Sequence, residues 1–170
     1  MLRIAQESDF DQVIGVYADS MEYAASEHLD TEWRITHQYF GYLQGNRELH
    51  VSDDGTEDDP LLHGAVVLSE RYNQSEWDGS APETGMYVGK LATANVVRGT
   101  RYVGRVMLPS IVEIALSRGK ESIRLNYRGE DTGLGDFYEG LGFEPAGANA
   151  FYSGTRKKEM TTVNMIKKIS

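Results

Sequence analysis

The chain has 170 residues, 40% of them hydrophobic and 25% charged, which suits one globular domain over residues 1–170 with a substantial core. Its net charge of −9 argues against nucleic acid or an anionic membrane as a partner, because both attract clustered Lys and Arg. The absence of cysteine excludes disulfides, thiolate metal ligands and a cysteine nucleophile. There is no signal-peptide pattern and no run of about 20 apolar residues, so we expect a cytoplasmic protein that does not span a membrane.

The first half of the chain predicts a strand, two helices and a hairpin. In chain order the expected elements are a strand at 2–4, a helix from about residue 10, a helix from about residue 30 to 45, and strands at 48–52 and 61–68. Ser8 or Asp9 can cap the first helix, and Gly45 ends the second. The polar stretch 53–60 is rich in turn residues and joins the two strands, and residues 70–85 predict a surface loop.

Residues 87–119 predict a strand, a basic turn and an amphipathic helix. The strand residues are apolar or β-branched: Val88, Leu91, Thr93, Val96 and Val97. The helix has apolar residues at near-helical spacing from Val103 onward and ends at Arg118-Gly119, where glycine can adopt a left-handed cap. Pro109 removes one hydrogen bond from this helix and predicts a kink.

The turn at 98–105 has the composition of an anion-binding site. A helix N-terminus leaves backbone N–H groups without partners and is electropositive, and glycines let the backbone approach an anion. Arg98, Arg101 and Arg105 add three positive charges to an otherwise acidic chain. From the spacing alone, a phosphate-binding turn and a solvated basic loop are equally supported.

The second half of the chain continues with alternating strands and helices. The expected elements are a strand at 122–127, a short helix at 133–140, and strands at 143–152 and 160–169. The basic residues 154–158 join the last two strands. No internal repeat, low-complexity tract or linker divides the chain.

The turn and the short helix together resemble the two main motifs of the GCN5-related N-acetyltransferases, the GNAT family. In that family a strand leads into an arginine or glutamine, a GxG turn and a helix; Arg98-Gly99 matches the start of this turn and Val103-Gly104-Arg105 its end. One residue more than usual separates the two, and Tyr102 stands where the first glycine is usual. The stretch 136–144, DFYEGLGFE, resembles the family's FYxxLGF signature, so the likeness covers residues 86–147.

This resemblance implies an α/β fold with a mixed central sheet of about six or seven strands and about four flanking helices. It implies an N-acetyltransferase that moves an acetyl group from acetyl-CoA to a primary amine of a small molecule or peptide, by direct attack in a ternary complex. The alternative is a protein that keeps the fold as a CoA-binding or regulatory module without turnover. A homodimer is compatible with both.

The resemblance also implies functional residues. Tyr138 would protonate the leaving thiolate, and the alternative is a tyrosine that packs the short helix onto the sheet. The residues implied in cofactor binding lie on the strand, in the turn and in a later loop: Leu91, Ala92, Thr93, Arg98, Gly99, Arg101, Val103, Gly104, Arg105 and Asp131. The strand residues would act through backbone groups, as a peptide adds to the edge of a sheet. Asp131 stands where many relatives carry an asparagine.

No general base is assigned, because the stretch 86–97 contains no carboxylate. Four carboxylates elsewhere remain open for this role: Glu22, Glu27, Glu70 and Glu83. The four histidines are scattered without ligand spacing, so no metal is expected. The acidic stretch 53–59 is interpreted as a solvated hairpin tip or, alternatively, as a device that steers a cationic acceptor.

Overall fold

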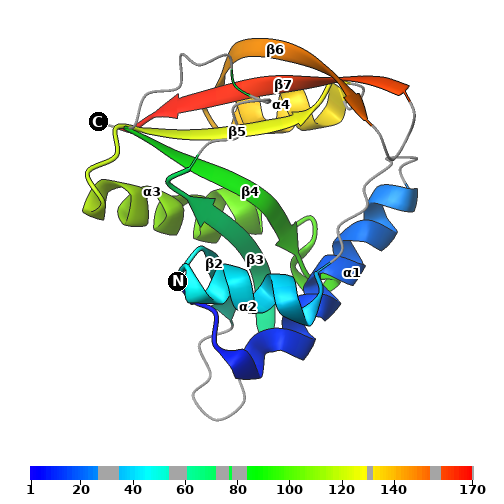
Figure 1. The fold of residues 1–170 in the computed structure, drawn as a ribbon, viewed down its shortest axis with the longest axis vertical. Coiled ribbons are helices and arrows are strands. Elements are labelled where there is room, and N and C mark those ends of the chain that lie inside the picture. The colour runs from blue at the N-terminus through cyan, green and yellow to red at the C-terminus, as the bar shows by residue number, and fades with distance from the viewer. Residues whose placement is uncertain are drawn as a thin grey trace. The chain divides into compact units, whose positions relative to one another are not determined.

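The computed structural model of the chain describes residues 1–26, 35–53, 61–71, 77, 84–129, 132–153 and 158–169. In chain order the elements are β1 (Leu2–Ile4), η1 (Glu7–Asp9), α1 (Phe10–Ser26), α2 (His37–Gly45), β2 (Leu49–Asp53), β3 (Leu62–Ser69), β4 (Gly85–Thr93), η2 (Asn95–Val97), η3 (Val103–Met107), α3 (Leu108–Ser117), β5 (Ser122–Arg128), α4 (Thr132–Gly140), β6 (Glu144–Ser153) and β7 (Lys158–Lys168) (Figure 1). The predicted order of strands and helices is confirmed.

The strands form one seven-stranded sheet in the order β1-β2-β3-β4-β5-β7-β6. β4 and β5 are parallel, whereas the pairs β1–β2, β2–β3, β5–β7 and β6–β7 are antiparallel. Parallel neighbours need a crossover connection, which α3 supplies between β4 and β5. The mixed sheet of seven strands with four α-helices confirms the expected fold class.

The chain forms two compact units, which are described separately below. The first comprises residues 1–68 and 89–113, and the second comprises residues 69–88 and 114–170. The chain crosses between them at the end of β3, after Leu68, within β4, after Val88, and within α3, after Glu113. That the whole chain acts as one domain stays a prediction.

The core of the first unit is built from α1, α2 and the strands β2 and β3. Its members are buried apolar residues: Ala5, Val13, Val16, Tyr17, Ile35, Phe40, Leu43, Leu49, Val51, Leu62, Ala65, Val67, Ala92 and Ala94. Val13, Val16 and Tyr17 are spaced three and four residues apart on α1, so one face of this helix is buried. The two helices are thereby packed onto β2 and β3.

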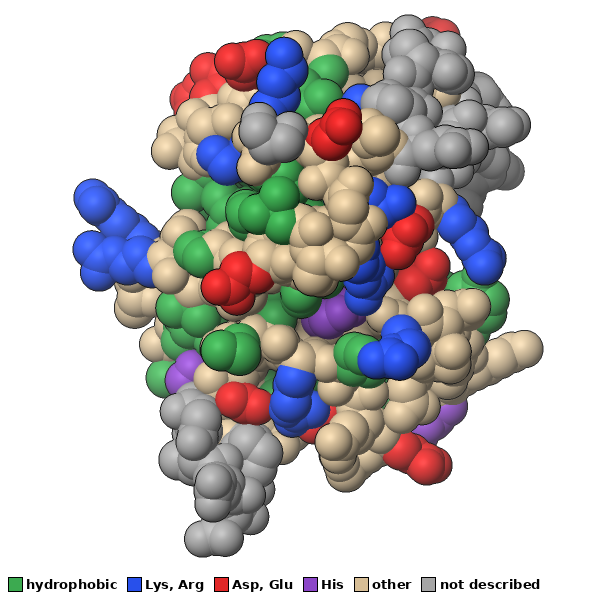
Figure 2. All heavy atoms as spheres, turned by 90° about the vertical axis from the view of Figure 1, so that its left-hand side faces the viewer, with side chains coloured by type: hydrophobic (Ala, Val, Ile, Leu, Met, Phe, Trp, Pro, Cys, Tyr) green, Lys and Arg blue, Asp and Glu red, His purple; other side chains and the backbone are tan. Residues whose placement is uncertain are grey.

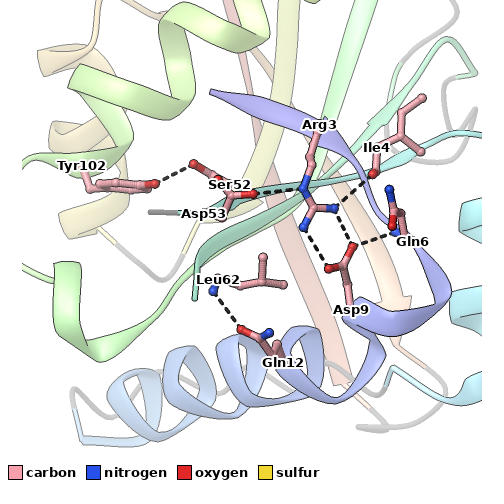
Figure 3. Close-up of polar contacts among 9 residues, drawn as sticks. All are labelled: Arg3, Ile4, Gln6, Asp9, Gln12, Ser52, Asp53, Leu62 and Tyr102. Atoms are coloured by element: carbon pink, nitrogen blue, oxygen red, sulfur yellow. Dashed lines mark hydrogen bonds and ion pairs between the residues drawn. The ribbon is translucent and has the colours of Figure 1, made fainter. Parts of the chain in front are cut away.

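The start of α1 differs from the prediction. The expected cap at Ser8 or Asp9 is wrong, because the chain first forms the 3₁₀ turn η1, whose N-cap is Gln6. The carboxylate of Asp9 accepts a hydrogen bond from the Gln6 N–H at 2.7 Å and two from the Arg3 guanidinium at 2.7 and 2.9 Å (Figure 3). Asp9, the last residue of η1, therefore stabilises the entry to α1.

The second helix also begins later than predicted. It starts at His37 rather than near residue 30, because Thr36 has an extended backbone and its hydroxyl caps the helix by accepting a hydrogen bond from the Tyr39 N–H at 3.2 Å. Ile35, which was expected in this helix, precedes the cap. Residues 30–34 lie outside the described part of the chain.

The central strand ends earlier than predicted. β4 stops at Thr93, and Val96 and Val97 belong to the 3₁₀ turn η2. The apolar pattern was misleading because only Val97 is buried, whereas Val96 is 65% exposed. The N–H of Asn95 binds the carboxylate of Asp19 on α1 at 2.7 Å, which turns the chain away from the strand direction.

The second unit follows the predicted elements closely. β5 pairs over its whole length with residues 162–168 of β7, from Ser122↔Lys168 to Arg128↔Thr162, and α4 lies in the connection from β5 to β6. Gly135 on α4 lies against β5, since an added Cβ would be 2.7 Å from the Tyr127 hydroxyl. Among the residues that the structure describes, no helix is both long and apolar enough to cross a lipid bilayer.

Candidate functional site

The turn between β4 and α3 adopts a compact backbone with two left-handed residues. Gly99 has φ +77° and Arg101 has φ +60°, a region that a residue with a Cβ enters only at some energetic cost. The Thr100 hydroxyl donates to the Val97 carbonyl at 2.6 Å and closes the first half of the turn. Glycine at position 99 therefore suits this turn, because it adopts positive φ without that cost.

The extra residue of the turn is accommodated in a π-helical segment. Val103–Met107 forms this segment, and the Leu108 N–H donates to the Val103 carbonyl, five residues earlier. A π-turn holds one residue more than an α-turn and is frequent at functional sites. The predicted α-helix from Val103 is thus wrong for its first turn and right from Leu108 onward. Pro109 directly follows the wide turn, where its ring and missing N–H disturb the helix less than in a regular interior.

Tyr102 and Met107 anchor the two ends of the π-helical segment within the first unit. The Tyr102 hydroxyl and the Ser52 hydroxyl on β2 are 2.5 Å apart (Figure 3), and the Tyr102 ring meets the His63 ring edge-on at 5.7 Å. Met107 is fully buried against β3, where an added Cβ on Gly64 would be 2.8 Å from its sulfur. The residue that replaces the first glycine of the motif is therefore a packing residue.

The three arginines of the turn have different surroundings. Arg98 donates to the Asp19 carbonyl at 3.0 Å, and its guanidinium lies 4.3 Å from the centroid of the Tyr23 ring, so it is held by α1. Arg101 and Arg105 are exposed, and neither side chain makes a hydrogen bond or ion pair with another described residue. Two positive charges at the start of the helix thus face solvent.

Residues 91–93 of β4 lie beyond the part of the strand that pairs with β5, which covers residues 85–87. The Ala94 N–H binds the His63 carbonyl on β3 at 2.9 Å. Because successive residues of a strand direct their backbone groups to opposite edges, Leu91 and Thr93 direct theirs away from β3. At Thr93 these groups are bonded to Ser20 on α1: the hydroxyl accepts from the Thr93 N–H at 3.1 Å and donates to its carbonyl at 3.2 Å.

Lys90 precedes this edge and has φ +49°, a left-handed conformation inside a strand. The Tyr17 hydroxyl donates to its carbonyl at 2.8 Å, and its ammonium nitrogen lies 5.6 Å from the centroid of the Tyr39 ring. Burial lowers the pKa of the Lys90 ammonium. The side chain is therefore a half-buried amine over the Tyr39 ring, and Lys90 directly precedes Leu91 in the chain.

Tyr138 lies in the last turn of α4, in the second unit, and helps to form the C-terminal end of this helix. The Phe143 N–H donates to the Tyr138 carbonyl at 3.1 Å, the Gly142 N–H donates to the Glu139 carbonyl at 2.9 Å, and Gly142 has φ +81°. This is a Schellman motif, which normally brings a hydrophobic contact between the residues at its ends. The rings of Tyr138 and Phe143 make this contact, edge-on at 5.8 Å. The spacing of Tyr, Gly and Phe in the signature is thus explained by the helix end, whatever else Tyr138 does.

No sequence family model matches the chain, and no curated protein matches it by sequence. Solved structures do match: an acetyltransferase of the GNAT family from Listeria monocytogenes has a TM-score of 0.76 at 15% identity, over 99% of this chain and 94% of that one. The ribosomal-protein-S18-alanine N-acetyltransferase of Escherichia coli has a TM-score of 0.67 at 15% identity, over 100% of this chain and 94% of that one. The chain has the GNAT fold.

A third match concerns a ligand. A Salmonella typhimurium structure with acetyl-CoA as its cofactor has a TM-score of 0.66 at 13% identity, covering 100% of this chain and 94% of that one. The likeness in the GNAT fold thus extends over the whole length of the chain. It confirms, at the level of the fold, the resemblance carried by the turn 98–105 and the stretch 136–144.

The structure shows on which elements the predicted residues lie, and their functional roles stay predictions. Leu91, Ala92 and Thr93 end β4, and the predicted turn residues lie between η2 and α3. Asp131, Glu27 and Glu83 lie outside the described residues, as do residues 54–59 of the acidic stretch. Glu22 is exposed on α1, and Glu70 binds Lys120 at 2.8 Å. The general base therefore stays unassigned.

The sequence interpretation missed Ser20 and Lys90, as well as the hydrogen bond made by Tyr17. Ser20 and Tyr17 lie three residues apart on α1, and their hydroxyls bind backbone groups of β4. A lysine within an apolar strand was the available signal for Lys90.

Within the described parts of the chain, no three His, Asp or Glu side chains gather as a metal site would need.

Proposed function

We propose that the protein is an acetyl-CoA-dependent N-acetyltransferase. One combination of features in the first unit carries this proposal. Arg101 and Arg105 are exposed at the π-helical segment, and the backbone groups of Leu91 and Thr93 on β4 are directed away from β3. The GNAT fold of the chain and the acetyl-CoA in the Salmonella structure support it. The acetyl-CoA would be a substrate that supplies the acyl group, with no metal required.

The turn would hold the pyrophosphate of the donor. Arg101 and Arg105 would bind its oxygens, since a charged donor to a phosphate forms a strong hydrogen bond and both side chains face solvent. Gly99, Val103 and Gly104 would contribute backbone close to the anion. The edge of Leu91 and Thr93 would pair with the amides of the pantetheine arm, as a strand is added to a sheet. Pairing at Thr93 requires that the Ser20 hydroxyl be displaced.

The reaction would be the attack of a neutral amine on the thioester carbonyl in a ternary complex. A backbone N–H at the end of β4 would stabilise the oxyanion, and Tyr138 would protonate the leaving thiolate. The acceptor would be a primary amine of a small molecule or peptide. The chain's charge of −9 favours such a cationic acceptor, and on the face shown in Figure 2 lysines and arginines lie interspersed with acidic and apolar side chains.

The proposal is tested first by binding. Thermal unfolding is measured with acetyl-CoA, with CoA and without ligand, and each of the two ligands should raise the melting temperature. Gly104→Val, which adds a branched side chain to the turn, should weaken CoA binding more than tenfold, or by about 1.4 kcal/mol. Gly41→Val is the matched control, because Gly41 is an exposed glycine of α2 with open space around it. Equal CoA affinity of folded Gly104→Val and wild type would contradict the proposed place of the pyrophosphate.

The second candidate is a CoA-binding or regulatory module without turnover. It is favoured by two observations: the β4 segment contains no carboxylate, and its edge at Thr93 is already bonded to Ser20. Release of free thiol from acetyl-CoA across a panel of amines, which includes polyamines, amino acids and peptides, separates the two candidates. Binding without thiol release with any amine would favour the module.

A further inference from the structure

Arg101 has a left-handed backbone conformation in the middle of the turn. Its φ is +60°, in a region that a residue with a Cβ enters at an energetic cost and keeps only where its surroundings hold it. The Arg101 carbonyl accepts a hydrogen bond from the Arg105 N–H at 3.0 Å. The next residue, Tyr102, connects the same backbone to β2 through its bond to Ser52 (Figure 3). These two contacts therefore hold the conformation of Arg101 from its C-terminal side.

A β-bulge in the hairpin of β2 and β3 provides the surface on which Tyr102 is held. The pairing shifts by one residue between Ser52 and Asp53, and His63 is the extra residue on β3. Bulges bend a strand and redirect its side chains. Here the ring of His63 meets the Tyr102 ring edge-on at 5.7 Å, and the hydroxyls of Ser52 and Tyr102 are 2.5 Å apart. The ring and the hydroxyl of Tyr102 thus both contact the bulge.

The bond between Tyr102 and Ser52 is shielded from water on the strand side. The Ser52 side chain is fully buried, and a buried hydroxyl costs free energy unless it is hydrogen-bonded. Loss of the Tyr102 hydroxyl would remove the partner that Ser52 has in the turn. The turn would then be less firmly attached to β2, directly after the left-handed residue Arg101.

The side chain of Arg101 does not explain why the fold keeps this conformation. It is exposed, and its guanidinium makes no hydrogen bond or ion pair with another residue that the structure describes. Backbone strain that the surroundings maintain is frequent where a ligand is bound. The combination of a held backbone and an exposed charge points to a role for Arg101 in binding.

We propose that Tyr102 and Ser52 are positioning residues, which act through Arg101 on the binding of the acyl donor. The inference rests on the proposed function, since it needs the pyrophosphate of acetyl-CoA at the turn. The bond between the two hydroxyls keeps Arg101 left-handed before the ligand arrives, so that its guanidinium is preorganised for the phosphate oxygens. Without this bond, Arg101 relaxes toward the conformations that a residue with a Cβ prefers, and binding has to restore the turn.

The test combines the loss of the bond with the loss of Arg101 and measures CoA affinity of the full chain by calorimetry. Tyr102→Phe and Ser52→Ala each remove one hydroxyl of the pair, and each should weaken CoA binding about fivefold. In an Arg101→Gln background neither should weaken binding further, because the residue through which they act is gone. In an Arg105→Gln background the loss of about fivefold should persist.

Denaturant unfolding of the same proteins separates positioning from stabilisation. Loss of the bond should lower the free energy of unfolding by the same amount with and without the Arg101 side chain, because the guanidinium contacts neither hydroxyl. Tyr42→Phe is the matched control for Tyr102→Phe. Tyr42 lies on α2 and is 52% exposed, so removal of its hydroxyl should change neither CoA affinity nor stability.

The outcomes separate this inference from the proposed function. Equal losses of CoA affinity with and without Arg101 would mean that the bond only stabilises the fold, and would overturn the inference. Wild-type affinity in folded Tyr102→Phe and Ser52→Ala, with binding still weakened by Arg101→Gln, would overturn it and leave the proposed function intact. Unchanged affinity in Arg101→Gln, or no CoA binding by the wild-type chain, would overturn both. If Tyr102→Phe fails to fold, Ser52→Ala provides the same comparison.

Discussion

The hydroxyl of Ser20 on α1 bonds to both backbone polar groups of Thr93, accepting from its N–H at 3.1 Å and donating to its carbonyl at 3.2 Å. A neighbouring strand would satisfy the same two groups in a regular sheet. One side chain thus takes the place of a strand at the point where β4 runs beyond its pairing with β5. The arrangement satisfies both backbone groups of Thr93, and in the proposed function a ligand amide would replace the Ser20 hydroxyl there.

Replacing Ser20 by alanine should therefore separate stability from ligand binding. Ser20→Ala leaves the Thr93 groups without this partner, so the free energy of unfolding should fall by roughly 1 kcal/mol. CoA affinity should rise about fivefold, or by roughly 1 kcal/mol, because the pantetheine arm no longer has to displace the hydroxyl. Calorimetry and denaturant unfolding measure the two effects.

Ser26→Ala is the control for this substitution. Ser26 is on the same helix, and its hydroxyl donates to the Tyr23 carbonyl at 2.7 Å within that helix. It should change neither CoA affinity nor, by more than a few tenths of a kcal/mol, stability. If Ser20→Ala bound CoA no more tightly than wild type, the arm would not pair with Thr93.

Substitution of the three arginines of the turn should have different effects on CoA affinity and on the melting temperature. Arg101→Gln and Arg105→Gln each remove an exposed charge, and we expect CoA affinity to fall about tenfold, less at high salt, because exposed charges are screened. Arg98→Gln removes the contacts to the Asp19 carbonyl and the Tyr23 ring, so it should lower the melting temperature first. CoA titrations at two salt concentrations, with melting curves for all three variants, test this. A loss of affinity in Arg98→Gln as large as in the other two would overturn the assignment.

The order of elements could be predicted from the sequence because apolar periodicity and turn residues carry it locally. The strand at β5, the helix end at Gly119 and the short helix α4 agree with the prediction for this reason. At Gly119, φ is +68°, and the Lys120 N–H closes a Schellman motif on the Ala115 carbonyl at 2.9 Å. Such features depend on a few adjacent residues, so a local pattern is sufficient.

The details of the site depend on contacts that are distant in the sequence. From the sequence, the extra residue before Val103 was equally compatible with a wider loop and with a π-turn. The hydrogen bond between Tyr102 and Ser52 and the packing of Met107 on Gly64 favour the π-turn. The end of β4 and the position of Arg98 likewise depend on Asp19, more than 70 residues away along the chain. Local periodicity contains no information about such partners, which is why the strand was predicted too long.

The stability of the first unit should depend on pH through Asp9. Burial opposes ionisation of its carboxyl group, but hydrogen bonds from Arg3 and from the Gln6 N–H outweigh this and lower its pKa. A carboxyl group whose pKa is lower in the folded state stabilises the fold above its unfolded-state pKa of about 3.9. This contribution is lost as the pH falls through the lower folded-state pKa.

Asp9→Asn should thus be less stable than wild type at pH 7, and the difference should shrink as the pH falls below about 4. Denaturant unfolding at several pH values measures this. Glu70→Gln is the matched control: the pKa of Glu70 is also lowered, by a hydrogen bond from Lys120, but its side chain is 49% exposed. An exposed ion pair contributes little, so this control should show almost no effect. A pH-independent difference for Asp9→Asn would contradict the ionic role.

Tyr138 has an observed packing role, and its proposed catalytic role can be separated from it by removing the hydroxyl alone. Tyr138→Phe keeps the ring that contacts Phe143, together with the Schellman motif at the end of α4. If the hydroxyl protonates the thiolate, turnover should fall roughly a hundredfold or more, while CoA affinity stays unchanged, because that hydrogen bond strengthens only as charge develops on sulfur.

Phe137→Leu is the control, since Phe137 precedes Tyr138 and is 42% exposed, and it should keep wild-type turnover. Steady-state kinetics with the best acceptor and calorimetry with CoA measure both effects. Wild-type turnover in a folded Tyr138→Phe protein would leave Tyr138 with its packing role alone.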